Sequence, residues 1–186
     1  MAKVFIFRHG ETTDNKEGIF SGNRDVDLTE EGILEAQKIG EELKNESVTR
    51  AYQSDLIRSK HTLELVLNGY HPNVEIITDP RIKERDYGDL TGTKKEELEA
   101  KDPADFKVWH RSYDIPPPNG ESIKEVEVRV LSFLSDLKDQ AKKDDVILIS
   151  AHGNSIRPMR RYFENLTIEE MMSFEHTPGK IYSYNI

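Results

Sequence analysis

Short apolar runs and longer segments of helical periodicity follow one another along the chain. The short runs are strand-like because polar residues, proline or glycine bound each of them. They cover residues 3–7, 48–54, 74–78, 146–151 and 181–186. Strands that alternate with helices predict an α/β fold in which a mostly parallel central sheet lies between two layers of helices, a three-layer αβα sandwich.

The segments between these runs carry the signals that begin helices. Thr29 precedes two acids and an apolar face, which is typical of a helix N-cap. Ser122 with Glu125, and Thr167 with Glu170, form the capping-box pattern. We expect helices over residues 29–43, 56–67, 94–100, 103–111, 122–137, 155–164 and 167–174, with Pro158 in the first turn of its helix.

Two stretches interrupt the alternation. Residues 80–92 are polar and broken by glycine, so we expect a long loop outside the core. Residues 116–120, three prolines followed by asparagine and glycine, predict a rigid turn that is too short to link two domains. With 186 residues and no internal repeat, the chain is expected to form one domain over residues 1–186.

Two histidines occupy the same position relative to predicted strands. His9 follows the first apolar run and precedes Gly10, and His152 follows Ala151 and precedes Gly153. Ligands bind at the carboxyl ends of strands in open α/β sheets, so the two imidazoles meet there if their strands are neighbours. A lone histidine is more often structural, but the repeated setting favours a role as base, metal ligand or nucleophile.

Three charged residues are further candidates for the site. Arg8 precedes His9 and could grip phosphate oxygens with its planar guanidinium. Arg58 lies at the start of a predicted helix, where backbone N–H groups also attract anions, although a single arginine there is usually solvated. Glu84 is an acid in a polar loop, which by itself is weak evidence for a site.

The composition of the chain, and the sequence motifs that it lacks, exclude several classes of function. The net charge of −9 disfavours binding to nucleic acid or to anionic membranes, and the lack of cysteine excludes disulfides and a thiolate nucleophile. No apolar run approaches the roughly 18 residues of a membrane helix, and no signal-peptide pattern is present, so a cytoplasmic protein is expected. The sequence also lacks a His-x-x-x-His metal pattern, a Walker loop, a dinucleotide glycine fingerprint and a nucleophile elbow.

Taken together, the chemistry-bearing motifs resemble the histidine phosphatase superfamily. The resemblance rests on residues 8–12, 54–59, 84 and 151–153, in the right order over most of the chain. Within the superfamily, the chain is similar to the cofactor-dependent phosphoglycerate mutases at residues 84–92, 95, 109–118 and 152–157.

The resemblance implies a role for each matched residue. His9 is expected to be the nucleophile that becomes phosphohistidine, and Glu84 the proton donor and acceptor. The residues implied to bind the transferring phosphoryl group are Arg8, Arg58 and His152. The implied contacts to phosphate or substrate are Asn15, Ser21, Gly22 and Asn154, with Tyr87, Lys95 and Arg111 holding the rest of a phosphoglycerate.

The implied activity is that of a 2,3-bisphosphoglycerate-dependent phosphoglycerate mutase, which interconverts 2- and 3-phosphoglycerate in glycolysis and gluconeogenesis. The resemblance implies 2,3-bisphosphoglycerate as the priming phosphoryl donor and no metal. The expected partner is a small phosphorylated substrate, without nucleic acid or membrane, and a homo-oligomer is allowed. The alternative is a phosphatase of the same fold that hydrolyses small phosphate monoesters. A non-catalytic binding protein is least favoured, because every core catalytic position is filled.

Four features depart from the mutase pattern. Typical mutases carry an arginine pair where this chain has His110 and Arg111, and tryptophan where it has Asp14. They also carry a longer insertion after the proline run, whereas here Gly120 follows at once, and a mobile tail beyond the position of Ile186. A site without that tail is expected to admit water, which favours hydrolysis.

Overall fold

The computed structural model describes residues 1–186, apart from the side chain of Arg111. Its sheet has five strands in the order β3-β2-β4-β1-β5. The strands are β1 (Lys3–Arg8), β2 (Arg50–Gln53), β3 (Glu75–Thr78), β4 (Val146–Ala151) and β5 (Ile181–Asn185). All neighbouring pairs are parallel except β1 with β5, so the predicted mostly parallel sheet is confirmed.

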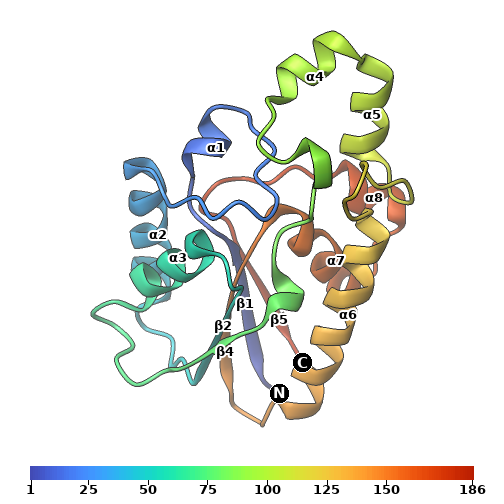
Figure 1. The fold of residues 1–186 in the computed structure, drawn as a ribbon. Helices are drawn as coiled ribbons and strands as arrows, with labels where there is room; N and C mark the ends of the chain where they lie inside the picture. Colours follow the sequence, from blue (N-terminus) through green and yellow to red (C-terminus); the bar gives the residue numbers. More distant parts are fainter.

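Helices cover both faces of this sheet (Figure 1). They are α1 (Thr13–Lys16), α2 (Glu30–Leu43), α3 (Ile57–Leu67), α4 (Lys95–Lys101), α5 (Pro103–Arg111), α6 (Ile123–Gln140), α7 (Gly153–Glu164) and α8 (Ile168–Ser173). Two short 3-10 turns, η1 (Pro80–Ile82) and η2 (Gly88–Leu90), lie between β3 and α4. The expected helices are therefore present, and α1 is an additional short helix that the sequence pattern did not indicate.

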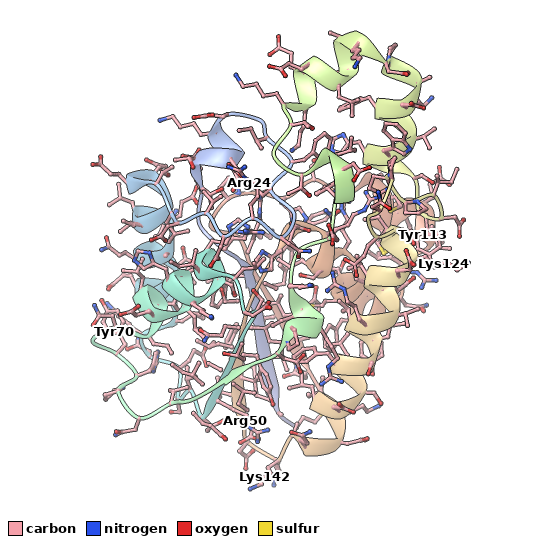
Figure 2. The ribbon with its side chains drawn as sticks, in the orientation of Figure 1. Arg24, Arg50, Tyr70, Tyr113, Lys124 and Lys142 are labelled. Carbon is pink, nitrogen blue, oxygen red and sulfur yellow. The ribbon has the colours of Figure 1, made fainter. Side chains whose placement is uncertain are left out.

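Alternate residues of β1 divide the core into two layers. Val4 and Ile6 pack in a cluster with α6 and α7, whereas Phe5 and Phe7 pack in a second cluster with α2 and α3. This division follows from the strand geometry, in which successive side chains point to opposite faces. The two clusters confirm the three-layer αβα sandwich, and Figure 2 shows side chains filling the space between the layers.

A third, smaller cluster supports α4 and α5 above the carboxyl end of the sheet (Figure 1). Phe20, Tyr87 and Leu90 are buried in it, and Phe106 and Trp109 of α5 pack against them. The cluster joins three stretches that are distant in sequence. It therefore builds a wall beside the end of the sheet where His9 and His152 are located.

The expectation that residues 80–92 lie outside the core is wrong. Ile82 is fully buried in the cluster beneath α6, and Arg85 is also fully buried. Asp79 caps η1 by accepting a hydrogen bond from the backbone N–H of Arg81, which turns Ile82 towards the core. A single apolar residue among charged ones leaves no periodic signal, so the pattern of the sequence does not show this burial.

The predicted start of α7 and the predicted place of Pro158 are also wrong. The helix begins at Gly153 rather than Ser155, so Pro158 lies inside it. The backbone N–H of His152 donates to Ser155 Oγ at 3.1 Å, and the carbonyl of His152 accepts from Ile156 N–H at 2.9 Å. Because His152 itself caps the helix, the helix starts directly at the end of β4 and points its first N–H groups towards the site.

Candidate active site

The pairing of β1 with β4 brings the two strand-end histidines together. Arg8 is in register with Ala151, and the backbone N–H of His9 donates to the carbonyl of Ala151 at 3.0 Å. The ring centroids of His9 and His152 lie 5.0 Å apart with an interplanar angle of 55°. The structure therefore places both imidazoles at the same edge of the sheet, as the strand-end positions predict.

The hydrogen bonding of His9 defines its neutral tautomer. Nδ1 lies 2.8 Å from the carbonyl oxygen of Gly10, and a carbonyl can only accept, so Nδ1 carries the proton. The lone pair is then on Nε2. Burial lowers the pKa of His9 well below its usual value, and the charges of Arg8 and Arg58 lower it further. His9 is thus a neutral imidazole with an unprotonated Nε2 at neutral pH.

Gly10 permits the close approach on which this geometry depends. A Cβ at Gly10 would lie 2.2 Å from the carbonyl oxygen of Gly32 in α2, a distance that no side chain tolerates. The backbone N–H of Gly10 also donates to Thr62 Oγ1 at 3.1 Å. The turn after β1 is therefore fixed between α2 and α3, and it presents the carbonyl that orients His9.

His152 is held by the loop that follows β2. Its Nε2 lies 2.7 Å from Ser54 Oγ, and that hydroxyl also accepts from the backbone N–H of Leu56 at 3.2 Å. Burial lowers the pKa of His152 well below its usual value, with further contributions from Arg58 and His9. A neutral His152 that accepts the Ser54 hydroxyl proton at Nε2 carries its own proton on Nδ1, where it can donate to an anion.

Arg58 is buried, with 1% of its surface exposed, and its terminal nitrogens are already engaged. Nη1 donates to the carbonyl of Arg24 at 2.7 Å, and Nη2 donates to the carbonyl of Gly22 at 2.8 Å. Burial lowers the pKa of Arg58, and Glu84 opposes this shift. The guanidinium is therefore fixed by backbone carbonyls, and its Nε, which has no partner among the described residues, is able to bind a ligand.

Three buried nitrogens of this cluster have no hydrogen-bond partner among the described residues: Nε of Arg8, Nε of Arg58 and Nδ1 of His152. Buried polar groups are almost always paired, and an unpaired one costs stability. The two guanidinium groups carry positive charge and His152 adds a neutral nitrogen, so the three groups beside His9 fit the oxygens of a phosphoryl group.

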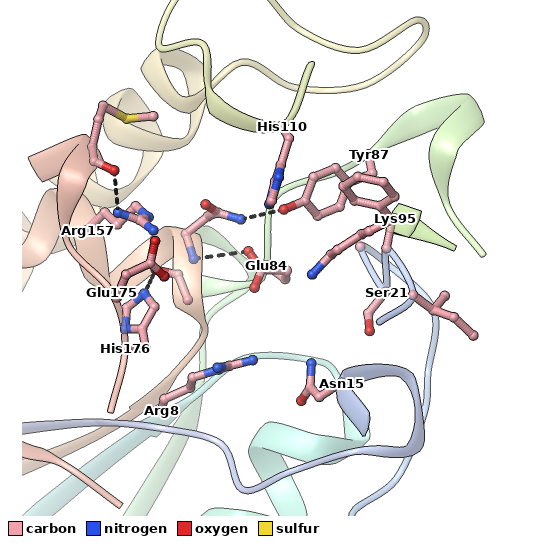
Figure 3. Close-up of a pocket in the computed structure, with 16 residues that line it drawn as sticks. Arg8, Asn15, Ser21, Glu84, Tyr87, Lys95, His110, Arg157, Glu175 and His176 are labelled. Carbon is pink, nitrogen blue, oxygen red and sulfur yellow. Dashed lines mark hydrogen bonds between the residues drawn. The ribbon is translucent and has the colours of Figure 1, made fainter. Parts of the chain in front are cut away.

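Glu84 lies beside the start of α7. Its Oε1 accepts from the backbone N–H of Arg85 at 2.7 Å and from that of Asn154 at 3.2 Å. A Cβ built on Gly153 would lie 3.7 Å from Oε2 of Glu84. The carboxyl group thus lies beside the first residues of α7, which directly follow His152, and Glu84 is 8% exposed. Figure 3 shows the residues around it.

A cavity of about 210 Å³ opens beside these groups (Figure 3). The predicted site residues that line it are Arg8, Asn15, Ser21, Gly22, Glu84, Tyr87, Lys95 and Asn154. His9, Arg58 and His152 do not line it, and they are buried, with 5%, 1% and 0% of their surfaces exposed. Arg111 is also a predicted contact, but its side chain lies outside the described part of the structure.

Several residues that line the cavity were given no role in the sequence analysis, although Arg157 lies in the mutase-like stretch 152–157. Arg157 of α7 lines the cavity and donates from Nη1 to the carbonyls of Met171 and Met172. His176 Nε2 lies 2.7 Å from the carbonyl of Gly153, and burial with the charge of Arg8 lowers the pKa of His176 to about 3. The segment from Met172 to His176 therefore closes one side of the cavity, although its sequence has no motif that indicates this.

Two further observations concern metals and membranes. The described part of the structure contains no group of three His, Cys, Asp or Glu side chains that could hold a metal ion. No helix in the described chain is both long and apolar enough to span a membrane.

Comparison with known proteins places this site in a family. A model of the histidine phosphatase superfamily (branch 1) matches residues 4–186. A 2,3-bisphosphoglycerate-dependent phosphoglycerate mutase from Rhizobium etli is 37% identical over 181 residues, which cover 95% of this chain and 86% of the relative. A mutase of the same name from Nitrobacter winogradskyi is 37% identical over 188 residues, which cover 98% of this chain and 91% of the relative.

Solved structures share the fold. The Bacillus stearothermophilus protein YhfR has a TM-score of 0.89 at 25% identity, over 98% of this chain and 90% of that one. The alpha-ribazole phosphatase from Shigella flexneri has a TM-score of 0.85 at 28% identity, over 99% of this chain and 90% of that one. Since the family model spans nearly the whole chain, this protein is an enzyme of the histidine phosphatase superfamily, branch 1.

Proposed function

We propose that this enzyme is a phosphoglycerate mutase that interconverts 2- and 3-phosphoglycerate through a phosphohistidine at His9, with 2,3-bisphosphoglycerate as the priming phosphoryl donor. The observation that carries the proposal is the second polar wall of the cavity. Tyr87, Lys95, His110 and Asn154 line the same cavity as Arg8 and Glu84. Hydrolysis of a simple phosphate monoester needs only the groups around His9, whereas a mutase must also retain the glycerate during the transfer.

The groups around His9 suit the transfer step. Nε2 of His9 attacks the phosphorus atom and forms the N–P bond as the ester O–P bond breaks. The three unpaired N–H groups of Arg8, Arg58 and His152 bind the oxygens on which charge builds up. The carboxyl group of Glu84 gives its proton to the leaving oxygen and takes a proton from the hydroxyl that attacks in the return step.

The donor set also fits 2,3-bisphosphoglycerate as the cofactor. Arg8 and the unpaired N–H groups beside His9 suit one phosphoryl group. Lys95 and Tyr87 provide polar groups for the rest of the bisphosphoglycerate. The hydroxyl of Tyr87 is held by a hydrogen bond from Asn154 Nδ2 at 3.0 Å. The cofactor supplies the phosphoryl group that primes the enzyme. The relatives from Rhizobium etli and Nitrobacter winogradskyi, which carry the mutase name, support this choice.

A phosphatase acting on small phosphate monoesters is the second candidate. The structural likeness to the alpha-ribazole phosphatase from Shigella flexneri favours it, as does His110 in the place of a mutase arginine. In a phosphatase, water rather than a hydroxyl of the bound glycerate takes the phosphoryl group from His9.

The two candidates differ in the products they make from 3-phosphoglycerate. The test incubates the enzyme with 3-phosphoglycerate, with and without 2,3-bisphosphoglycerate, and measures 2-phosphoglycerate and inorganic phosphate. The proposal predicts rapid 2-phosphoglycerate that depends on the bisphosphate. Free phosphate alone would show a phosphatase instead. The His9→Ala enzyme is the control, since it should form neither product.

A further inference from the structure

The segment that carries Glu84 is held by a side chain that does not line the cavity. Arg129 lies on α6 and donates from Nη1 to the carbonyls of Arg81 at 2.7 Å and Lys83 at 2.9 Å. Its Nη2 donates to the carbonyl of Glu84 itself at 3.0 Å. One guanidinium therefore binds three backbone carbonyls of the stretch from Arg81 to Glu84, which its planar fork of donors allows.

Glu121 binds both Arg129 and the backbone that follows Glu84. Nε of Arg129 donates to Oε1 of Glu121 at 2.9 Å, and Nη2 donates to Oε2 at 3.0 Å. The same Oε2 accepts from the backbone N–H of Asp86 at 2.9 Å. The side chains of Arg129 and Glu121 are 16% and 25% exposed, so the pair is largely shielded from water. The Arg129–Glu121 clamp thus fixes the backbone on both sides of Glu84.

We infer that Arg129, with Glu121 as its counter-ion, is a positioning residue that sets the orientation of the Glu84 carboxyl group. The inference rests on the proposed role of Glu84 as proton donor. Oε1 of Glu84 reaches the N–H of Asn154 at 3.2 Å, which is near the long end of hydrogen-bond distances. A small displacement of the Glu84 backbone therefore moves the carboxyl group away from α7 and from the leaving oxygen.

The geometry explains why lysine cannot replace Arg129. An ammonium is a point charge on a flexible stem, whereas these contacts require donors spread across a rigid plane. Three carbonyls and two carboxylate oxygens share the nitrogens of one guanidinium. Arg129→Lys keeps the charge but loses this arrangement, so it tests positioning rather than electrostatics.

The test compares two phosphate monoesters that differ in leaving group. Glycerol phosphate requires protonation of the leaving oxygen, whereas p-nitrophenyl phosphate does not. Arg129→Lys should reduce kcat/KM, which reports formation of the phosphohistidine, by about 10²-fold on glycerol phosphate, the cost of a small misplacement, and by only a few-fold on p-nitrophenyl phosphate. Both esters report hydrolysis, so the comparison remains valid whether or not the enzyme proves to be a mutase.

Double substitution separates this inference from the role of Glu84. If Arg129 acts through Glu84, the Arg129→Lys/Glu84→Gln enzyme should be no slower on glycerol phosphate than Glu84→Gln alone. The inference would be overturned if the double variant lost the product of the two single-variant losses in rate. It would also be overturned if Arg129→Lys lost the same factor on both esters. Equal losses on both esters for Glu84→Gln would instead overturn the proposed role of Glu84.

Asp136 provides the matched control. It also lies on α6, and it pairs with the Arg81 side chain at 2.7 Å, so Asp136→Asn removes a contact between the same helix and the same loop away from Glu84. That change should leave the ratio of the two rates unaltered. If Arg129→Lys does not fold, Glu121→Gln carries the test, because it keeps the side-chain shape and weakens only the charged pair. It should show the same selective loss on glycerol phosphate, and an equal loss on both esters would contradict the inference.

Discussion

The imidazoles of His9 and His152 lie 5.0 Å apart at the ends of two adjacent parallel strands, and burial lowers the pKa of each. Arg8 and Arg58 contribute positive charge near both rings and lower the pKa values further. Two neutral imidazoles in a positive environment suit opposite tasks. One can offer a lone pair to phosphorus, and the other can donate a hydrogen bond to a phosphoryl oxygen.

The first prediction concerns the protonation state of His9. Because its pKa is lowered, the neutral form should persist as the pH falls below about 6.5, the ordinary value for histidine. Histidine NMR, with His9→Gln to assign the signal, should show no titration of His9 near that pH. A midpoint at or above about 6.5 would show that the surroundings do not favour the neutral ring.

The same shifts predict a loss of stability in acid. His9, His152 and His176 bind fewer protons in the folded chain than in the unfolded chain once the pH drops below about 6.5. The free energy of unfolding should therefore fall as the pH decreases from that value towards the lowered pKa values. Urea unfolding measured from neutral to mildly acid pH should show a shallower dependence for His176→Gln, since His176 has a pKa of about 3 in the fold. An unchanged slope would refute its contribution.

Glu84→Gln tests the assigned proton donor. The amide keeps the shape of the carboxyl group but cannot transfer a proton, so kcat/KM with an alkyl phosphate, which reports formation of the phosphohistidine, should fall by roughly 10²–10⁴-fold. The loss should be much smaller with p-nitrophenyl phosphate, whose leaving group needs little protonation. Similar losses on both substrates would indicate that Glu84 is structural.

His110 provides a test of substrate retention. Its ring lines the cavity and packs 5.6 Å from Phe20 and 4.9 Å from Phe106, measured between centroids. His110→Arg would place a permanent charge and more donors there, so KM for phosphoglycerate should fall about tenfold and transfer should gain over hydrolysis. Lys107→Arg, on the exposed side of α5, is the matched control. An unchanged KM and an unchanged product ratio would show that residue 110 does not contact the substrate.

The sequence predicts the layers of this fold because apolar periodicity is strong at the strands and at the long helices. The meeting of His9 and His152 follows from the same pattern, since both come directly after buried strands that proved to be neighbours. The capping boxes at Ser122 and Thr167 are also confirmed, because a cap depends on residues only three positions apart.

The remaining features depend on contacts between distant residues. The burial of Ile82 and Arg85 arises from packing beneath α6 and against Trp109, which local composition does not encode. The cavity wall formed by Arg157 and His176 depends on hydrogen bonds to backbone carbonyls, and any sequence could supply these acceptors. Arg129 likewise donates to the backbone carbonyls of Arg81, Lys83 and Glu84, acceptors that any sequence could supply.

The most direct test of the central claim follows one phosphoryl group through His9. The enzyme is labelled with 2,3-bisphosphoglycerate that carries labelled phosphorus, freed of excess donor, and then mixed with 3-phosphoglycerate. We predict an acid-labile, base-stable label on His9 that passes to the phosphoglycerates, while His9→Ala takes up no label. Label on another residue, or its release only as inorganic phosphate, would contradict a mutase that works through His9.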